Sequence, residues 1–220
     1  MSPGMATGNS DGFTAALQLL FPEMRQIHPD WQEILPDFSL AASLSRMPTG
    51  RSSVAHWLAD LMDWEPLPET LPELPPMVHL GAAALEEELL TAAAAHHYQR
   101  LRSIVERDAI RELHALPGQA RYEFCLRVVP LLPEPPAIDP AGNSLPVTRQ
   151  EWLQAGIRCL SFALADLPAG VRQRLRLRLP LPGAINAFPD RQPGAGQQSW
   201  RNWLNRVNKE YELWQHFSPR

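Results

Sequence analysis

The chain has 220 residues, enough for one sizeable core or for one domain with an appendage, and an ordinary apolar fraction of 45%. The net charge of −4 predicts no dominant polyelectrolyte partner. The charge is uneven, because residues 171–220 hold 9 basic and 3 acidic side chains while residues 1–170 hold 11 and 21. This positive end could meet an acidic partner or fold against the acidic body of its own chain.

The N-terminal region, residues 1–64, is predicted to contain short helices separated by prolines. His28-Pro29 is typical of a turn or an extended dipeptide, and Pro29 suits the first turn of a helix that runs to about Leu35. Another short helix is predicted after Asp37, and apolar residues recur at helical spacing over 54–62.

Residues 65–76, with the sequence EPLPETLPELPP, are predicted to form an extended, polyproline-like linker. The linker separates the N-terminal region from a main helical domain over residues 77–220. A proline-rich ligand for a small recognition domain is the alternative, but stiff spacers commonly have this composition.

Residues 77–132 are predicted to form the centre of the fold. Strong helix formers dominate 77–104, and further helices are predicted over 107–115 and 119–129, with a turn at Pro117-Gly118. Because the connections are short, we expect the three helices to pack as an antiparallel cluster.

Charged residues interrupt the apolar pattern of this central region. Glu86, Glu87 and Glu88 exclude a membrane span and predict a solvated helix face rather than an acid/base pair. On the third helix, Arg121 is predicted to point away from the apolar face. The apolar face comprises Tyr122, Cys125, Leu126 and Val129.

A second proline-rich connector is predicted over 130–147, and Thr148 to Glu151 then matches a capping box, which is a strong helix start. In the following segment, VRQRLRLRLP, leucine and arginine alternate with the period of a strand. Both residue types are good helix formers, and the preceding Pro168 suits a helix start. We therefore favour a helix to about Leu179.

Residues 180–198 are predicted to be loop, and Ser199 can cap a last helix over 200–214. One face of this helix is heavily aromatic, through Trp200, Trp203, Tyr211 and Trp214. We favour packing of this face on the core. The alternative is a partner-binding surface, because tryptophan and tyrosine dominate binding hot spots. The whole pattern predicts an all-α fold: an irregular multi-helix domain with proline-rich connectors around a central antiparallel helical cluster.

The sequence contains no recognisable catalytic motif or metal-ligand spacing among its seven histidines. We therefore predict no catalytic residue, no metal, no cofactor and no small-molecule ligand. Two alternatives stay open. Arg172 to Arg178 could make the chain a helical DNA-binding regulator, and His96, His97 and Glu86–Glu88 could form the non-obvious site of an enzyme.

The cellular compartment is predicted from the cysteines and the N-terminus. Cys125 and Cys159 lie among apolar residues and behave as small hydrophobes, which fits a reducing compartment. The N-terminus lacks the pattern of a secretory signal, so we expect a cytoplasmic protein without direct membrane insertion.

Three segments resemble the SctK family, the YscK-like accessory proteins of bacterial type III secretion. FPEMRQIHPDWQEILP is similar to the family's entry motif, with Phe21, Pro22, His28-Pro29 and Trp31 at the matching positions. The segment from Ile104 to Leu132 resembles its central helical pair, and LRLRLP at 175–180 its late arginine-leucine segment. Pro22 departs from the family, which usually has a polar residue there.

The resemblance implies a non-enzymatic adaptor in the cytoplasmic sorting platform of the secretion apparatus. Such a protein links the cytoplasmic domain of an SctD-like inner-membrane ring protein to an SctQ-like pod protein, and is peripheral to the inner membrane through the apparatus. No nucleic-acid partner is implied. The candidate partner-binding residues are His28, Pro29, Trp31, Trp200, Trp203, Tyr211 and Trp214. The first three could instead only orient the N-terminal helices.

Overall fold

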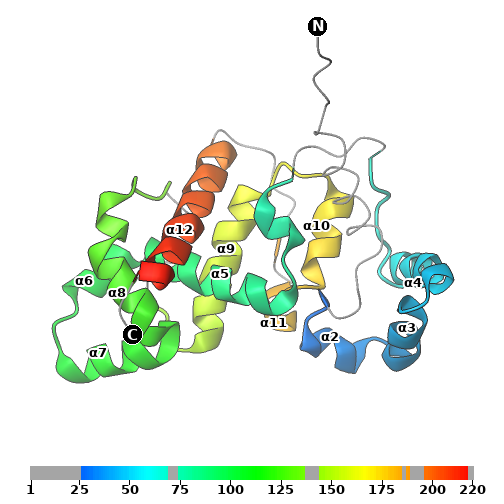
Figure 1. The fold of residues 1–220 in the computed structure, drawn as a ribbon, viewed down its shortest axis with the longest axis horizontal. Coiled ribbons are helices and arrows are strands. Elements are labelled where there is room, and N and C mark those ends of the chain that lie inside the picture. The colour runs from blue at the N-terminus through cyan, green and yellow to red at the C-terminus, as the bar shows by residue number, and fades with distance from the viewer. Residues whose placement is uncertain (1–25, 69–73, 137–143, 185–186, 189–195, 218–220) are drawn as a thin grey trace, which may run out of the picture. The chain divides into compact units, whose positions relative to one another are not determined.

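The computed structural model describes residues 26–68, 74–136, 144–184, 187–188 and 196–217 (Figure 1). Within these ranges every regular element is a helix, so the all-α prediction is confirmed. The chain forms two compact units, each described by itself below. The first unit comprises Met1–Ala83 and Leu167–Ile185, and the second comprises Ala84–Asp166 and Asn186–Arg220.

This division differs from the predicted one, because Leu167–Ile185 join the N-terminal residues in one unit. The predicted domains 1–64 and 77–220 and the linker role of 65–76 stay predictions. Residues 69–73 of that linker lie outside the described ranges.

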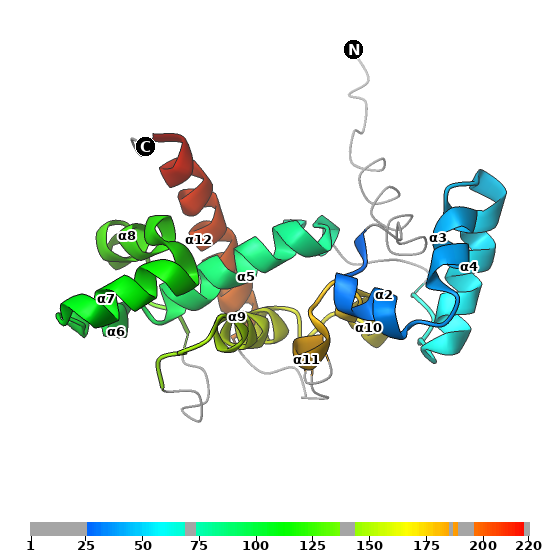
Figure 2. The ribbon, with the colours of Figure 1, turned by 90° about the horizontal axis from the view of Figure 1, so that it is seen from below.

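The first unit is built from short helices. The helices within its described residues are α2 (Pro29–Ile34), α3 (Phe38–Ser45), α4 (Pro48–Leu61), the 3₁₀ turn η2 (Pro76–His79), α10 (Ala169–Arg176) and α11 (Leu181–Ala184). Pro29 occupies the first turn of α2, as predicted, and His28 Nδ1 accepts a hydrogen bond from the Asp30 backbone N–H at 3.2 Å. Helices α3 and α4 lie side by side (Figure 2). The buried side chains include Ile27, Trp31, Leu58, Leu175 and Leu177.

The second unit holds longer helices. Its elements are α5 (Ala82–His96, from Ala84), α6 (Tyr98–Ser103), α7 (Arg107–Leu113), the π-helical turn η3 (His114–Gly118), α8 (Gln119–Arg127), the 3₁₀ turn η4 (Val129–Leu131), α9 (Arg149–Ala163) and α12 (Gln197–Phe217). Helix α12 packs along α9 and also contacts α8 (Figure 1). The largest fully buried side chains here include Trp152, Phe124, Leu90 and Leu101.

A glycine sets the approach of α9 to α5. A Cβ added to Gly156 on α9 would lie 2.2 Å from the carbonyl oxygen of Leu89 on α5, so only a residue without a side chain fits. The next residues of α5, Ala92 to Ala95, are also small and buried. The two backbones therefore pack against each other directly, without large side chains between them.

Several boundaries differ from the predictions. The predicted helix over 77–104 is divided into η2, α5 and α6, since Leu80 is extended and His97 interrupts the helix. The predicted turn at Pro117-Gly118 belongs to η3, with Gly118 at a φ of +91°. Short α11 lies within the predicted loop 180–198.

Helix starts and ends show mixed outcomes. Thr148 Oγ1 accepts from the Glu151 N–H at 3.2 Å, as the capping box predicts, while the Glu151 carboxylate accepts from the Val147 N–H at 2.7 Å, one residue early. The ambiguous arginine-leucine segment is a helix, α10. Ser199 is not the cap of α12, which begins at Gln197. Arg121 is buried, and Leu126 is 37% exposed, so the predicted orientation of α8 was wrong at both positions.

Candidate functional site

The His-Pro-x-Trp motif contacts the arginine-leucine segment within the first unit. The His28 N–H donates to the Leu177 carbonyl at 2.8 Å, and the Trp31 indole N–H donates to the Leu179 carbonyl at 3.0 Å. In return, the Leu181 N–H donates to Asp30 Oδ2 at 2.9 Å. Two of the segments that resemble the family therefore meet in one place, which we call the motif junction (His28–Trp31 with Leu175–Leu181).

The predicted partner-binding residues of this motif differ in their exposure. His28 and Trp31 are buried, at 9% and 8% exposed, while Pro29 between them lies at the surface. The surface of α2 continues through Ile34, which is 54% exposed. Burial favours an orienting role for His28 and Trp31. Both residues hold α2 on the arginine-leucine segment, and that segment covers them.

Two arginines of the same segment are buried and donate to backbone carbonyls. Arg178 is 3% exposed and its Nη1 donates to the carbonyls of Val78 and Leu80, the latter at 3.0 Å. Burial lowers the pKa of Arg178 to about 10. Arg174 Nη1 donates to the Glu65 and Gly170 carbonyls at 3.1 and 2.7 Å. Its guanidinium also lies 4.8 Å from the centre of the Trp64 ring.

These contacts bear on the DNA-binding alternative. Of the four arginines that would contact phosphates, Arg174 and Arg178 are engaged inside the first unit. A phosphate-contacting stripe needs its guanidinium groups at the surface, so this segment is poorly suited to DNA.

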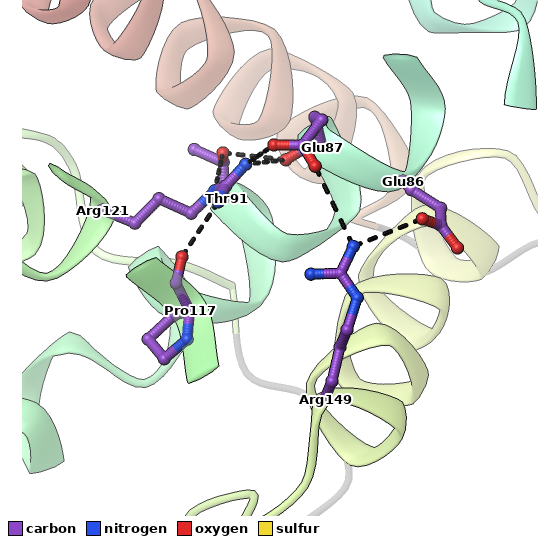
Figure 3. A network of polar contacts seen from close by, with 6 residues as sticks. All are labelled: Glu86, Glu87, Thr91, Pro117, Arg121 and Arg149. Atoms are coloured by element: carbon purple, nitrogen blue, oxygen red, sulfur yellow. Dashed lines mark hydrogen bonds and ion pairs between the residues drawn. The ribbon is translucent and has the colours of Figure 1, made fainter. Parts of the chain in front are cut away.

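In the second unit, the three consecutive glutamates of α5 contact three other helices, and Arg149 of α9 pairs with both Glu86 and Glu87 (Figure 3). Glu86 accepts from Arg149 of α9 at 3.3 Å, and Glu87 pairs with Arg121 of α8 (Figure 3). Glu88 accepts from the Asn208 amide of α12 at 2.7 Å. The Glu87 side chain is 59% exposed and that of Glu86 only 22%, so the predicted solvated face holds in part. This set of contacts, here called the glutamate network, joins α5 to the three helices around it.

Arg121 is the most connected member of the glutamate network. Besides Glu87, its Nε donates to Thr91 Oγ1 at 3.0 Å and its Nη1 to the Pro117 carbonyl at 2.9 Å (Figure 3). The guanidinium also lies 5.6 Å from the centre of the Tyr211 ring. A buried charge is tolerated when it is paired and its donors are satisfied, which is the case here.

The carboxyl group of Glu88 has a pKa near neutrality. Burial and, to a smaller extent, repulsion by Glu212 raise the pKa of Glu88 to about 7. The hydrogen bond from Asn208 acts in the opposite direction and lowers this pKa. The contact between α5 and α12 therefore changes charge at physiological pH.

The aromatic face of α12 is buried within the second unit. Trp200, Trp203 and Tyr211 are 3%, 5% and 8% exposed. The Trp200 and Trp203 rings meet edge-on at 5.3 Å, and Tyr211 meets Phe124 at 5.2 Å. Trp214 is half-buried, and the Arg127 guanidinium lies over its ring, 5.9 Å from the centre of the indole. This burial is what the core interpretation requires, and a partner-binding role for the face stays a prediction.

Reactive groups do not converge on α5. The glutamates and the His96-His97 pair are eight to eleven residues apart, which separates them by about 12 to 16 Å along a helix. Among the described residues, no group of three or more histidines, cysteines or carboxylates could hold a metal ion. In the same ranges, no helix has the length and apolar character to cross a membrane.

Among the described residues, the protein is all-helical, and in both units the polar side chains described above mainly connect one helix to another. The chain belongs to the YscK family, whose model, described as YOP proteins translocation protein K (YscK), matches residues 16–205. The resemblance found in the sequence is thus confirmed. Among curated proteins, none matches the chain significantly.

The chain is also similar in fold to a solved structure, that of the cytoplasmic domain of the T3SS sorting platform protein PscK from P. aeruginosa. The TM-score is 0.53 and the identity 23%, over 92% of this chain and 96% of that chain. At this identity the likeness establishes the fold.

Proposed function

We propose that this chain is a non-enzymatic cytoplasmic adaptor of a type III secretion sorting platform, peripheral to the inner membrane. In this role it links the cytoplasmic domain of an SctD-like ring protein to an SctQ-like pod protein. The observation that carries the proposal is the family match over residues 16–205, which spans both halves of the motif junction. The fold shared with the PscK cytoplasmic domain supports it.

The chemistry of the described residues is consistent with an adaptor. The buried arginines and the glutamates of α5 hold helices together, and such rigid bodies suit a protein that keeps two partners at a fixed geometry. The histidines and glutamates that an enzyme would need in one place are spread along α5.

For the partner surfaces, we propose the two regions named from the sequence, with the contact made by their exposed atoms. In the first, Pro29 and Ile34 of α2 would face the partner while His28 and Trp31 orient the helix. In the second, Trp214 and its neighbour Phe217, which is 82% exposed, would do so, held by the buried Trp200, Trp203 and Tyr211.

Binding measurements with point variants test these surfaces. Ile34→Asp should weaken capture of one partner, the SctD-type cytoplasmic domain or the SctQ-type pod protein, at least tenfold without changing the melting temperature. Val105→Asp is the matched control, because Val105 is 87% exposed and lies outside both regions. Equal binding by both variants would remove α2 from the interface. Deletion of the gene should abolish secretion, and normal secretion without the protein would overturn the adaptor role.

A further inference from the structure

The helical hairpin formed by α3 and α4 is attached to the rest of the first unit on both of its sides. It is entered from α2, where the Trp31 indole N–H donates to the Leu179 carbonyl at 3.0 Å. After α4, the Trp64 ring lies 4.8 Å from the Arg174 guanidinium, and Arg174 Nη1 donates to the Glu65 carbonyl at 3.1 Å. Both attachments are made to α10 and the few residues after it, so α2 and the exit from α4 lie close together.

The hairpin itself is tight. Only Arg46 and Met47 join α3 to α4, and the two helices pack side by side (Figure 2). A Cβ added to Gly50 would lie 2.3 Å from the Leu44 carbonyl oxygen, so the two backbones touch at the bend. Helix α4 therefore runs back along α3. With 14 residues against 8, it is about 9 Å longer, and it ends near the connection between α2 and α3.

Each of the three helix ends at this place carries an exposed apolar side chain. Ile34 is the last residue of α2 and is 54% exposed. Leu40, in the first turn of α3, is 59% exposed, and Leu61, the last residue of α4, is 42% exposed. A single exposed apolar side chain is ordinary, but a group of them on neighbouring helix ends is typical of a surface that another molecule covers.

Carboxylates accompany these apolar side chains. Each of the three has an exposed acidic residue within three positions of it in the sequence, and together these are Glu33, Asp37, Asp60 and Asp63. Among the described residues, none of the four carboxylates has an ion pair or a side-chain hydrogen bond. The basic side chains of the hairpin, Arg46 and Arg51, lie at its opposite end, and Arg174 is buried against carbonyls. We call Ile34, Leu40 and Leu61 with these four carboxylates the hairpin surface.

We propose that the hairpin surface binds a basic amphipathic segment of a partner protein. Apolar side chains of the segment cover Ile34, Leu40 and Leu61, and its lysine or arginine side chains pair with the carboxylates around them. An acidic segment gains only the apolar part of this contact and meets like charges, so charge selects the partner. The hairpin surface extends the first partner region of the proposed function, and it rests on that function only for which protein supplies the segment.

Three designed peptides test the hairpin surface without any secretion protein. Two have the same leucine stripe at helical spacing, with lysine at the other positions of one and glutamate at those of the other. The third keeps the lysines and has serine in place of leucine. Fluorescence anisotropy with the full chain should show saturable binding of the leucine-lysine peptide that weakens as salt is added. The leucine-glutamate peptide should not bind, and the serine-lysine peptide should bind at least about tenfold more weakly.

Point variants locate the binding. Leu40→Asn and Asp60→Lys should each weaken binding of the leucine-lysine peptide about tenfold, with an unchanged melting temperature because both side chains are exposed. Val105→Asn and Glu112→Lys are the matched controls, since they make the same kinds of change at exposed positions of the second unit and should leave binding unchanged. Absence of saturable binding, equal binding of the lysine and glutamate peptides, or full binding by both hairpin variants would overturn the proposal.

The same four variants are then measured with the SctD-type cytoplasmic domain and the SctQ-type pod protein. Weaker capture of one of these proteins by both hairpin variants, with both controls unaffected, assigns the basic segment to that protein. Capture of both at full strength by every variant would overturn the hairpin surface and leave the adaptor role standing. Peptide binding at the hairpin surface without capture of either protein would instead contradict the adaptor role and leave the hairpin surface standing.

Discussion

The motif junction and the glutamate network hold their helices together by different chemistry. In the motif junction, Trp31 and Arg178 donate to backbone carbonyls, which carry no charge and do not titrate, and one carboxylate, that of Asp30, accepts from the Leu181 N–H. In the glutamate network, carboxylates meet arginine and amide side chains, and Glu88 titrates near pH 7. The contacts of the motif junction should therefore depend less on pH and salt than those of the glutamate network.

The largest effect is expected at Trp31. Trp31→Ala removes a buried ring and the hydrogen bond to the Leu179 carbonyl, so the free energy of unfolding of the first unit should fall by about 4 kcal/mol. Trp31→Phe, which retains most of the buried ring, should cost about half as much. Chemical denaturation measures both. A loss below about 1 kcal/mol for the alanine variant would mean that the ring is not part of the core.

A loss of about 3 kcal/mol is expected for Arg178→Met. The variant keeps an apolar chain of similar length but leaves the Val78 and Leu80 carbonyls without their donor. Because these partners are neutral, the loss should be the same in low salt and in about 1 M NaCl. Arg149→Gln is the contrasting variant, since its half-exposed pair with Glu86 should contribute under about 1 kcal/mol and be screened by salt.

Gly156 tests packing in the second unit without changing any charge. Gly156→Ala places a methyl group against the Leu89 carbonyl, where the backbone of α5 cannot move aside easily, and should cost about 2 kcal/mol. Gly81→Ala is the matched control, because the nearest atom to its added Cβ is 4.0 Å away. Equal melting temperatures for the two variants would contradict direct contact between the α5 and α9 backbones.

An effect of about 1 kcal/mol that depends on pH is expected for Glu88→Gln. Because the pKa of Glu88 is raised, the contribution of this residue to the free energy of unfolding is full below pH 4.5, the ordinary pKa of a glutamate. The contribution is lost as the pH rises through about 7. The glutamine variant should therefore be more stable than the unmodified chain at pH 8 and equal to it near pH 4.

His97 changes the stability in the opposite direction with pH, and this change can be measured in the Glu88→Gln variant. Its pKa is lowered to about 4, so its contribution is present above 6.5 and is lost as the pH falls towards 4. With Glu88 replaced, stability should fall from pH 7 to pH 5. Melting curves across this range measure both effects, and parallel profiles for the two proteins would show that Glu88 does not titrate near neutrality.

The sequence predicted local structure well and contacts between distant segments poorly. The first-turn Pro29, the Thr148 cap and the helical nature of α10 depend on neighbouring residues, which a local pattern contains. Arg121 was predicted to point away from the apolar face because charge usually lies at the surface, and its partners Thr91 and Glu87 are 30 and 34 residues away in sequence. No local signal could indicate them.

The candidate site shows the same limit. The motif residues were identified from resemblance, but their contact with the arginine-leucine segment spans about 150 residues and follows only from the fold. The alternation of leucine and arginine held a hint, since arginines spaced evenly among buried leucines on a helix cannot all reach solvent. The burial of the α12 tryptophans was the favoured interpretation, because Trp200, Trp203, Val207, Tyr211 and Trp214 follow each other at three or four residues, which is typical of a core-facing helix.

The adaptor role is tested most directly by reconstitution of a three-component complex. The full chain, an SctD-type cytoplasmic domain and an SctQ-type pod protein are mixed pairwise and together, and sedimentation velocity measures the species formed. The adaptor role predicts a ternary species that forms only when this chain is present. Sedimentation of all three as separate species, or a complex of the two partners that excludes this chain, would contradict it.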